Sequence, residues 1–103
     1  MIPEAQIVQT QWWLMDCSFP SLNWARLRVY AKGNADVLDM DGRLLVFDTQ
    51  EDARKHLLED EYISMEYMTD DYYTKIGMRR EQLIPPYSRS DTELVPIMIV
   101  TRG

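Results

Sequence analysis

The chain has 103 residues, 46% of them hydrophobic, a length and composition typical of one folded domain that exclude a disordered polypeptide. The formal net charge of −6 argues against binding to nucleic acid or to an acidic membrane, because both are themselves negative. The single cysteine, Cys17, excludes an intramolecular disulfide and favours a reduced, cytoplasmic location. We therefore expect a single domain over residues 1–103, with no signal peptide, membrane span, metal or cofactor.

Two long strands are predicted at the start of the chain. Residues 6–17 carry apolar and polar side chains in the alternating order of a strand. Residues 24–31 alternate more regularly, with Arg26 and Arg28 on one parity and small or aliphatic side chains on the other. This second pattern indicates a strand with one solvent-exposed face. The segment between the two strands contains Pro20, which favours a turn.

A hairpin is predicted next. Residues 35–40 and 43–48 have the composition of two short strands on either side of Asp41 and Gly42. The Asp-Gly dipeptide favours a two-residue type I′ turn, because both central positions of that turn need a positive φ. Together with the two preceding strands, this hairpin predicts an antiparallel meander.

The pattern changes from strand to helix after the hairpin. Residues 49–60 predict a helix, because Ala53 and Leu57 form an apolar stripe at i, i+4 spacing. Asp48 or Thr49 would cap its N-terminus. Acidic residues fill the first turn and basic residues come later, which is the order that the helix dipole favours.

The segment after this helix is less regular. Residues 62–68 fit either a short strand or a buried connection. Thr69–Ile76 is predicted as a second helix, since Thr69 can cap it and acidic residues fill its first turn. Gly77 supports the same boundary, because glycine commonly follows the C-terminus of a helix.

The chain is predicted to end in a β-strand. Residues 82–93 have the composition of a loop, and residues 93–100 predict a strand in which Pro96 requires an edge or bulged position. The whole pattern predicts an α+β fold: an antiparallel sheet of about five strands, with two helices inserted before the last strand.

Motifs for metal binding and catalysis are weak. Asp39, Asp41 and Gly42 match part of a calcium loop, but Val37 would take its first position and cannot ligate through its side chain. One cysteine and one histidine, His56, do not make a zinc site. The sequence has no glycine-rich phosphate loop, nucleophile elbow or triad spacing. We therefore expect no enzyme, and a small enzyme that uses paired carboxylates is the least favoured alternative.

The negative charge is concentrated in one quarter of the chain. Residues 48–71 contain nine acidic residues against Arg54 and Lys55, whereas the rest of the chain holds eight acidic and nine basic residues. Glu59–Glu61 is a run of carboxylates at the predicted C-terminus of the first helix, where the helix dipole is already negative. Repulsion between these carboxylates opposes folding, so the run favours a role in binding.

Tyrosines lie among these carboxylates. A tyrosine offers a large, rigid contact area with a polar tip, and tyrosines mixed with carboxylates suit docking on a basic protein. Adjacent Tyr72 and Tyr73 would diverge by about 100° on a helix, so we expect one of them in the core and favour Tyr73 as the outward one. The candidate partner-binding residues are Glu59, Asp60, Glu61, Tyr62, Glu66, Tyr67, Asp70, Asp71, Tyr72 and Tyr73.

One segment carries a resemblance to a known family. The stretch VLDMDGRLLVFDTQEDARKHLLEDEY, Val37–Tyr62, resembles small bacterial immunity proteins of polymorphic-toxin systems, particularly those paired with contact-dependent growth inhibition toxins. The shared pattern is an Asp-Gly hairpin followed by a capped helix that ends in LLEDEY, and a looser similarity extends over residues 24–86. The resemblance implies a non-enzymatic cytoplasmic antidote that binds the C-terminal toxin domain of its cognate delivered protein. Many such toxins are nucleases, some of the ribonuclease A type.

These patterns favour one function and leave an alternative. The favoured function is an immunity or inhibitor protein that neutralises a basic toxin domain, above all a nuclease, by occluding its active site with an acidic, tyrosine-rich surface. An inhibitor of a DNA-binding protein would use the same charge physics. The alternative is a non-enzymatic adaptor or regulatory subunit of a larger assembly, in which Trp12, Trp13 and Trp24 would supply an apolar interface.

Overall fold

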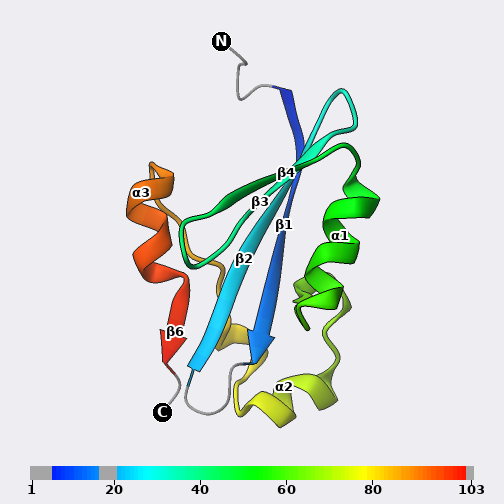
Figure 1. The fold of residues 1–103 in the computed structure, drawn as a ribbon. Coiled ribbons are helices and arrows are strands. Elements are labelled where there is room, and N and C mark those ends of the chain that lie inside the picture. Colours follow the sequence, from blue (N-terminus) through cyan, green and yellow to red (C-terminus); the bar gives the residue numbers. More distant parts are fainter. Residues whose placement is uncertain (1–5, 17–20, 102–103) are drawn as a thin grey trace.

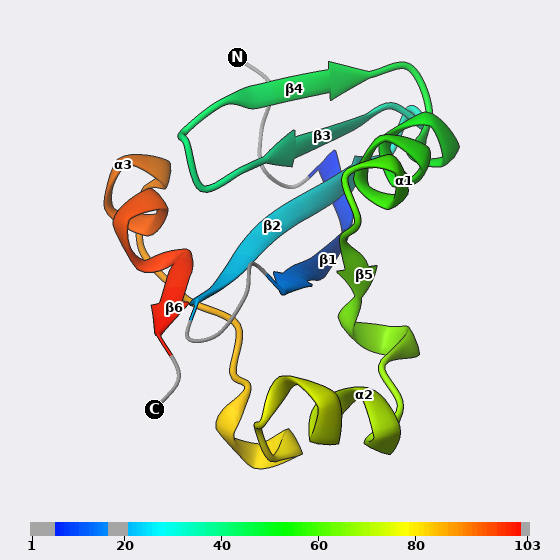
Figure 2. The same cartoon turned by 60° about the horizontal axis from the view of Figure 1, so that its bottom comes forward.

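The computed structural model describes residues 6–16 and 21–101, so Cys17 lies outside the described residues. The chain forms an antiparallel sheet with the strand order β4-β3-β2-β1-β5, and β6 pairs with β2 off this path (Figure 1; β5 is labelled in Figure 2). The predicted meander of four consecutive strands is therefore confirmed as β1 to β4. The strands are β1 (Ile7–Asp16), β2 (Ser21–Tyr30), β3 (Ala35–Leu38), β4 (Leu44–Phe47), β5 (Ile63–Ser64) and β6 (Ile99–Thr101).

Strand β2 is the central strand of the sheet, and it pairs with three other strands. On one edge it pairs with β1, which places Trp12 opposite Arg26 and Leu14 opposite Trp24. On the other edge, β3 and β6 pair with successive segments of β2. The backbone N–H of Trp24, which lies between these segments, donates to the carbonyl oxygen of Met98 at 2.8 Å. The C-terminal part of the chain is thereby fixed to the middle of the sheet.

Three α-helices lie around the sheet in the described residues. Helix α1 lies on one side of the sheet, α3 lies on the other, and α2 lies beyond the end of β1 (Figure 1 and Figure 2). None of the helices in the described part of the chain is long and apolar enough to cross a lipid bilayer. The helices are α1 (Gln50–Glu59), α2 (Asp70–Ile76) and α3 (Asp91–Leu94), with 3-10 turns at Met65–Tyr67, Arg80–Gln82 and Val95–Ile97.

The first two predicted helices are confirmed, and of the two caps considered for the first helix Thr49, not Asp48, is the N-cap. The Thr49 hydroxyl oxygen accepts the backbone N–H of Asp52 at 3.1 Å and begins α1. The Thr69 hydroxyl oxygen accepts the N–H of Tyr72 at 3.2 Å and begins α2. Each threonine satisfies an N–H that has no partner within its own helix, which is why these local signals suffice to start a helix.

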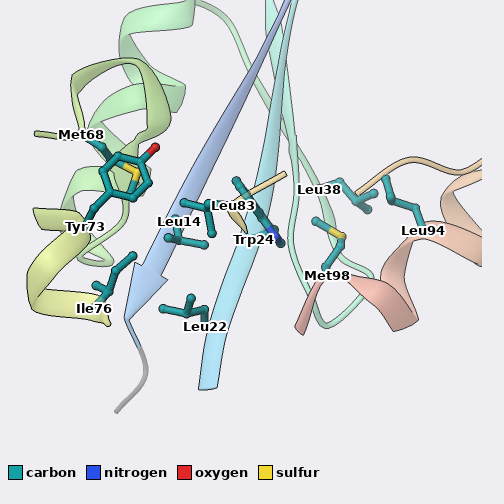
Figure 3. Packing of buried hydrophobic residues seen from close by; sticks show 10 residues of the cluster. All are labelled: Leu14, Leu22, Trp24, Leu38, Met68, Tyr73, Ile76, Leu83, Leu94 and Met98. Carbon is teal, nitrogen blue, oxygen red and sulfur yellow. The ribbon is translucent and has the colours of Figure 1, made fainter. Parts of the chain in front are cut away.

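Hydrophobic cores lie on both faces of the sheet. Alternate residues of β2 point into different cores, so that Leu27 packs with Trp13 and with Leu57 of α1, whereas Trp24 packs on the opposite face. The opposite core joins the sheet to α2 and to the C-terminal segment. Figure 3 shows its buried members, which are Leu14, Leu22, Trp24, Leu38, Met68, Tyr73, Ile76, Leu83, Leu94 and Met98.

The expectation of a solvent-exposed face on β2 is wrong for Trp24 and Arg26, which are only 1% and 8% exposed. The C-terminal segment covers them and supplies a charge partner. The Arg26 guanidinium donates to both carboxylate oxygens of Asp91, at 2.8 and 3.2 Å. Arg28 is half-buried and donates to both oxygens of Asp36, at 3.2 and 3.1 Å. Ion pairs of this kind allow arginines to face a covered surface, because a buried charge requires a partner.

The Asp-Gly hairpin forms, but not with the predicted type I′ turn. Glu61 is the one non-glycine residue with a positive φ in the described chain, so Asp41 lacks the positive φ that a type I′ turn requires. The Gly42 N–H instead donates to the carbonyl oxygen of Asp39 at 3.0 Å, and Gly42 itself has a φ of 82°. The Asp39 carboxylate fixes this longer loop, because it accepts the backbone N–H groups of Asp41 and Arg43 at 3.0 and 3.1 Å.

The predicted final strand over residues 93–100 is wrong for most of its length. Helix α3 and a 3-10 turn occupy this segment, and only β6 at its end is a strand. The Ser90 hydroxyl oxygen accepts the N–H of Glu93 at 3.3 Å, so a capped helix begins within the predicted loop of residues 82–93. Pro96 lies at the start of the 3-10 turn, where its missing N–H is harmless. The α+β class and the antiparallel sheet are confirmed, with a third helix and a shorter last strand.

Candidate partner-binding surface

The candidate residues differ in exposure. Tyr62 and Tyr73 are buried, at 7% and 4% exposed, and Tyr72 is half-buried. The two buried tyrosines lie below the surface. They support the exposed residues around them but do not present their rings to a partner. The exposed candidates are Glu59, Asp60, Glu61, Glu66, Tyr67, Asp70 and Asp71. They lie at three places along the chain: the end of α1, the 3-10 turn after β5, and the start of α2.

The expectation for the adjacent tyrosines of α2 is right in one part and wrong in another. One of the pair lies in the core, as expected, but it is Tyr73 rather than Tyr72. Tyr73 shares the buried face of α2 with Ile76, three residues later, and this spacing decides which face packs. The Arg80 guanidinium covers the Tyr73 ring, with its Cζ 4.6 Å from the ring centroid. Tyr73 is therefore not an outward contact.

The end of α1 is closed by two backbone hydrogen bonds of the Schellman type. The Tyr62 N–H donates to the carbonyl oxygen of Leu57 at 2.9 Å, and the Glu61 N–H donates to that of Leu58 at 3.1 Å. Tyr62 and Leu57 also belong to the same buried cluster, which is the apolar contact that accompanies this motif. Tyr62 therefore anchors the end of the helix, and it sets the direction in which the preceding carboxylates project.

Glu61 takes an unfavourable backbone conformation to make this turn. Its φ is 67°, in the left-handed region where a side chain costs about 1 kcal/mol or more. Helix α2 ends in a similar conformation, but there the residue is Gly77, with a φ of 72°. Both helices are thus followed by a residue in the left-handed conformation, which is glutamate after α1 and glycine after α2. Glutamate at this position lowers the stability of the fold.

The carboxylates at the end of α1 are poorly neutralised. Asp60 lies 3.5 Å from His56 Nε2, an arrangement that is an ion pair only when the histidine is protonated. Among the described residues, no ion pair or side-chain hydrogen bond reaches Glu59 or Glu61. The carbonyl end of the helix adds its own partial negative charge at this point. A strongly negative surface results.

A hollow of about 270 Å³ borders this end of α1. It lies between the loop of the β3–β4 hairpin and the last turn of the helix. Its polar lining consists of Asp39, Asp41, Arg43, His56 and Asp60. Its apolar lining consists of Met15, Val37, Met40, Leu57 and Tyr62. The hollow thus has an apolar floor and a charged border, and two of the candidate residues, Asp60 and Tyr62, belong to it.

Arg43 is the cation of this hollow. Its guanidinium lies 2.8 Å from Asp39 Oδ2 in an ion pair. Hydrogen bonding to Asp39 raises the pKa of Arg43, and the charges of Asp39, Asp41 and Asp60 raise it further. All three carboxylates therefore act on the same guanidinium, although Asp60 comes from α1 and the other two from the hairpin. Among the described residues, Asp39 alone forms an ion pair with Arg43. The lining contains three carboxylates and one guanidinium, so the negative charge of the hollow exceeds its positive charge.

The second place contains Glu66 and Tyr67 in the 3-10 turn after β5. Tyr67 is 61% exposed, and the Arg54 guanidinium of α1 lies 5.6 Å from its ring centroid. Arg54 also donates to Gln11 Oε1 at 3.1 Å and lies 5.2 Å from the centroid of Trp13. This contact holds Tyr67 beside α1, so its exposed ring area is presented in a defined position.

The third place, at the start of α2, needs no partner to explain its charge. Asp70 and Asp71 lie in the first turn, where the helix dipole favours carboxylates. Arg80 Nη2 donates to Asp70 Oδ1 at 2.7 Å, so this carboxylate also has an ion pair. Glu66 also has no ion pair among the described residues, but it is a single carboxylate, whereas Glu59–Glu61 places three carboxylates at the negative end of a helix.

The tryptophans do not form an exposed apolar interface. Trp13 and Trp24 are each 1% exposed, and Trp12 is half-buried with its ring in edge contact with Trp24 at a centroid distance of 5.8 Å. Trp13 and Trp24 therefore do not supply the apolar interface that the adaptor alternative would use. Both fully buried indoles pack in the cores, where large aromatic rings bury the most apolar area.

Comparison with protein-family models, with curated proteins and with solved structures finds no match for this chain. Among the described residues, no group of three or more His, Cys, Asp or Glu side chains is arranged to hold a metal ion.

The hairpin side of the hollow adds residues that the sequence does not predict as partner-binding. Asp39, Asp41 and Arg43 lie in the turn, and His56 lies on α1 one helical turn before Asp60. The one sequence feature that links these residues is that all of them fall within the segment Val37–Tyr62. Their convergence was not predictable because it depends on how α1 packs against the hairpin strands.

Proposed function

We propose that this protein is an immunity or inhibitor protein that binds a cognate basic toxin domain of the nuclease class and neutralises it. It acts in the cytoplasm without catalysis and without a cofactor. The segment that resembles immunity proteins, Val37–Tyr62, comprises the β3–β4 hairpin, α1 and the turn that closes α1. The proposal therefore concerns one continuous part of the fold, which contains the hollow and the exposed carboxylates beside it.

The observation that carries the proposal is the end of α1. Three exposed carboxylates follow one another where the helix dipole is negative, and Glu61 among them takes a left-handed conformation that glycine would adopt at lower cost. Each of these features lowers the stability of the isolated protein. A binding role accounts for them, because strain and unneutralised charge occur where a partner compensates for them.

The proposed mechanism has an electrostatic step and an occluding step. Carboxylates on one surface attract a basic partner and raise the rate of association. In the complex, these carboxylates lie where a nuclease would otherwise hold phosphate groups, so the substrate is excluded. Tyr67, exposed and held by Arg54, adds rigid contact area that slows dissociation.

The test is co-purification with the product of the gene immediately upstream, followed by a nuclease assay of that product with and without this protein. We expect a stable complex and loss of nuclease activity. The triple variant Glu59→Gln, Asp60→Asn, Glu61→Gln should bind at least tenfold more weakly. The matched control, Asp70→Asn with Asp71→Asn, should retain binding. Absence of a complex, or full nuclease activity within it, would contradict the proposed function.

A non-enzymatic adaptor is the second candidate, and one observation favours it. The edge strand β4 exposes Leu44 and Val46, at 48% and 72% of their surface, and such apolar area suits burial in an assembly. The two candidates predict different contacts. An adaptor would lose its partner on Val46→Lys and keep it in the triple carboxylate variant, and the proposed inhibitor would show the reverse.

A further inference from the structure

We propose that the hollow between the β3–β4 hairpin and the end of α1 receives one arginine or lysine side chain of the protein partner. This inference rests on the proposed function, because it specifies what the basic toxin domain inserts. Its basis is the combination of a cavity of about 270 Å³, an apolar floor and a border with excess negative charge.

The floor suits the aliphatic part of a long cationic side chain. Leu57 and Tyr62 are buried beneath it, and Met15 and Met40 add flexible apolar surface that adapts to the shape of an inserted group. Arginine and lysine bury their methylene stems against such surfaces while the charged head stays at a polar border. A purely polar ligand would leave this floor in contact with water.

The border supplies charge of the opposite sign. Asp39 is already bonded by Arg43, so its charge is largely neutralised within the protein. Asp41 and Asp60 are exposed, and among the described residues the one side chain paired with either is His56. Entry of an anion or of an uncharged group would leave these carboxylates dehydrated and unpaired, which is costly. A cation restores the balance, and the planar guanidinium of arginine can bond two carboxylates at once.

The site is formed before the partner arrives. On the hairpin side, the Asp39 carboxylate accepts two backbone N–H groups and holds the loop that carries Asp41. On the helix side, the Tyr62 N–H bonds the carbonyl of Leu57 and fixes the turn next to Asp60. Because both sides are held by hydrogen bonds within the protein, binding costs little conformational entropy.

A cation probe tests the site without the toxin. The isolated protein is titrated with n-butylguanidinium, and with n-butylurea as an uncharged molecule of the same shape, while backbone amide chemical shifts are followed by NMR. We expect saturable shifts for butylguanidinium at residues 39–43 and 56–62, with little change for butylurea. The double variant Asp41→Asn, Asp60→Asn should weaken this binding about fivefold. The control Asp70→Asn, Asp71→Asn should bind as the wild type does.

Three results would overturn the inference: no saturable shift at the hollow, equal shifts with butylurea, or shifts spread evenly over all acidic positions. The outcome is separable from the proposed function. Binding of butylguanidinium at the hollow, together with a failure to bind the toxin, would support this site and contradict the proposed function. Inhibition of the toxin, together with no response of the hollow to butylguanidinium, would support the proposed function and contradict this site.

Discussion

At the scale of single residues, the most informative position is Glu61. Its φ of 67° is needed to close α1, and glycine fulfils the same need in α2 at Gly77. Glutamate instead adds both backbone strain and a third negative charge at the negative end of a helix. The charge run was visible in the sequence, but the strain was not, because φ depends on how Tyr62 packs against Leu57.

Replacing Glu61 with glycine should therefore stabilise the isolated protein. We expect Glu61→Gly to raise the free energy of unfolding by about 1 kcal/mol, since it relieves the left-handed strain and one unit of repulsion. Urea denaturation measures the change. Gly77→Ala is the matched control and should lower the free energy of unfolding, because its added Cβ meets nothing within 4 Å and only backbone strain is introduced. A less stable Glu61→Gly variant would show that the glutamate supports the fold.

At the scale of elements, capped helices were predictable and the C-terminal segment was not. Thr49 and Thr69 accept N–H groups only three residues further along the chain, so the start of each helix can be recognised from a few neighbouring residues. The apolar run around Pro96 fits a strand or a buried helix equally well by composition. Its structure is decided by Ser90, which caps α3, and by the contact between Asp91 and the distant Arg26.

The ion pair between Arg26 and Asp91 makes the attachment of α3 dependent on pH. Hydrogen bonds from Arg26 lower the pKa of the Asp91 carboxyl below its usual value. A carboxyl with a lowered folded-state pKa stabilises the fold above its unfolded pKa of about 4, and this contribution is lost as the pH falls through the folded value. Stability should therefore decrease as the pH is lowered below about 4.

Asp91→Asn should lower the free energy of unfolding by about 1–2 kcal/mol at neutral pH, because it leaves the buried Arg26 without its charge partner. The effect stays this small because the carboxylate that is removed is itself 44% exposed. The substitution should also weaken the loss of stability below about pH 4, measured by urea denaturation across that range. Glu66→Gln is the control, because among the described residues this exposed carboxylate has no ion pair. An unchanged pH profile in Asp91→Asn would contradict the assigned role.

At the scale of the whole molecule, the fold distributes the acidic residues of segment 48–71 over the start and the end of α1, the 3-10 turn after β5 and the start of α2. Asp70 is neutralised by Arg80, and Tyr67 is held by Arg54, whereas Glu59–Glu61 keeps its charge beside the hollow. The class of fold and the position of the acidic surface were predictable from periodicity and charge. The hollow was not, because it requires the hairpin and the end of α1 to meet in space.

Electrostatic docking is tested by the salt dependence of the rate at which the protein associates with the upstream toxin domain, measured by stopped-flow fluorescence. We predict that the association rate falls at least tenfold as ionic strength rises from about 50 to 500 mM, because screening shortens the reach of the carboxylates. The triple variant at Glu59–Glu61 should associate slowly at low salt and respond weakly to added salt. An association rate that is indifferent to salt in the wild-type protein would contradict electrostatic docking by this surface.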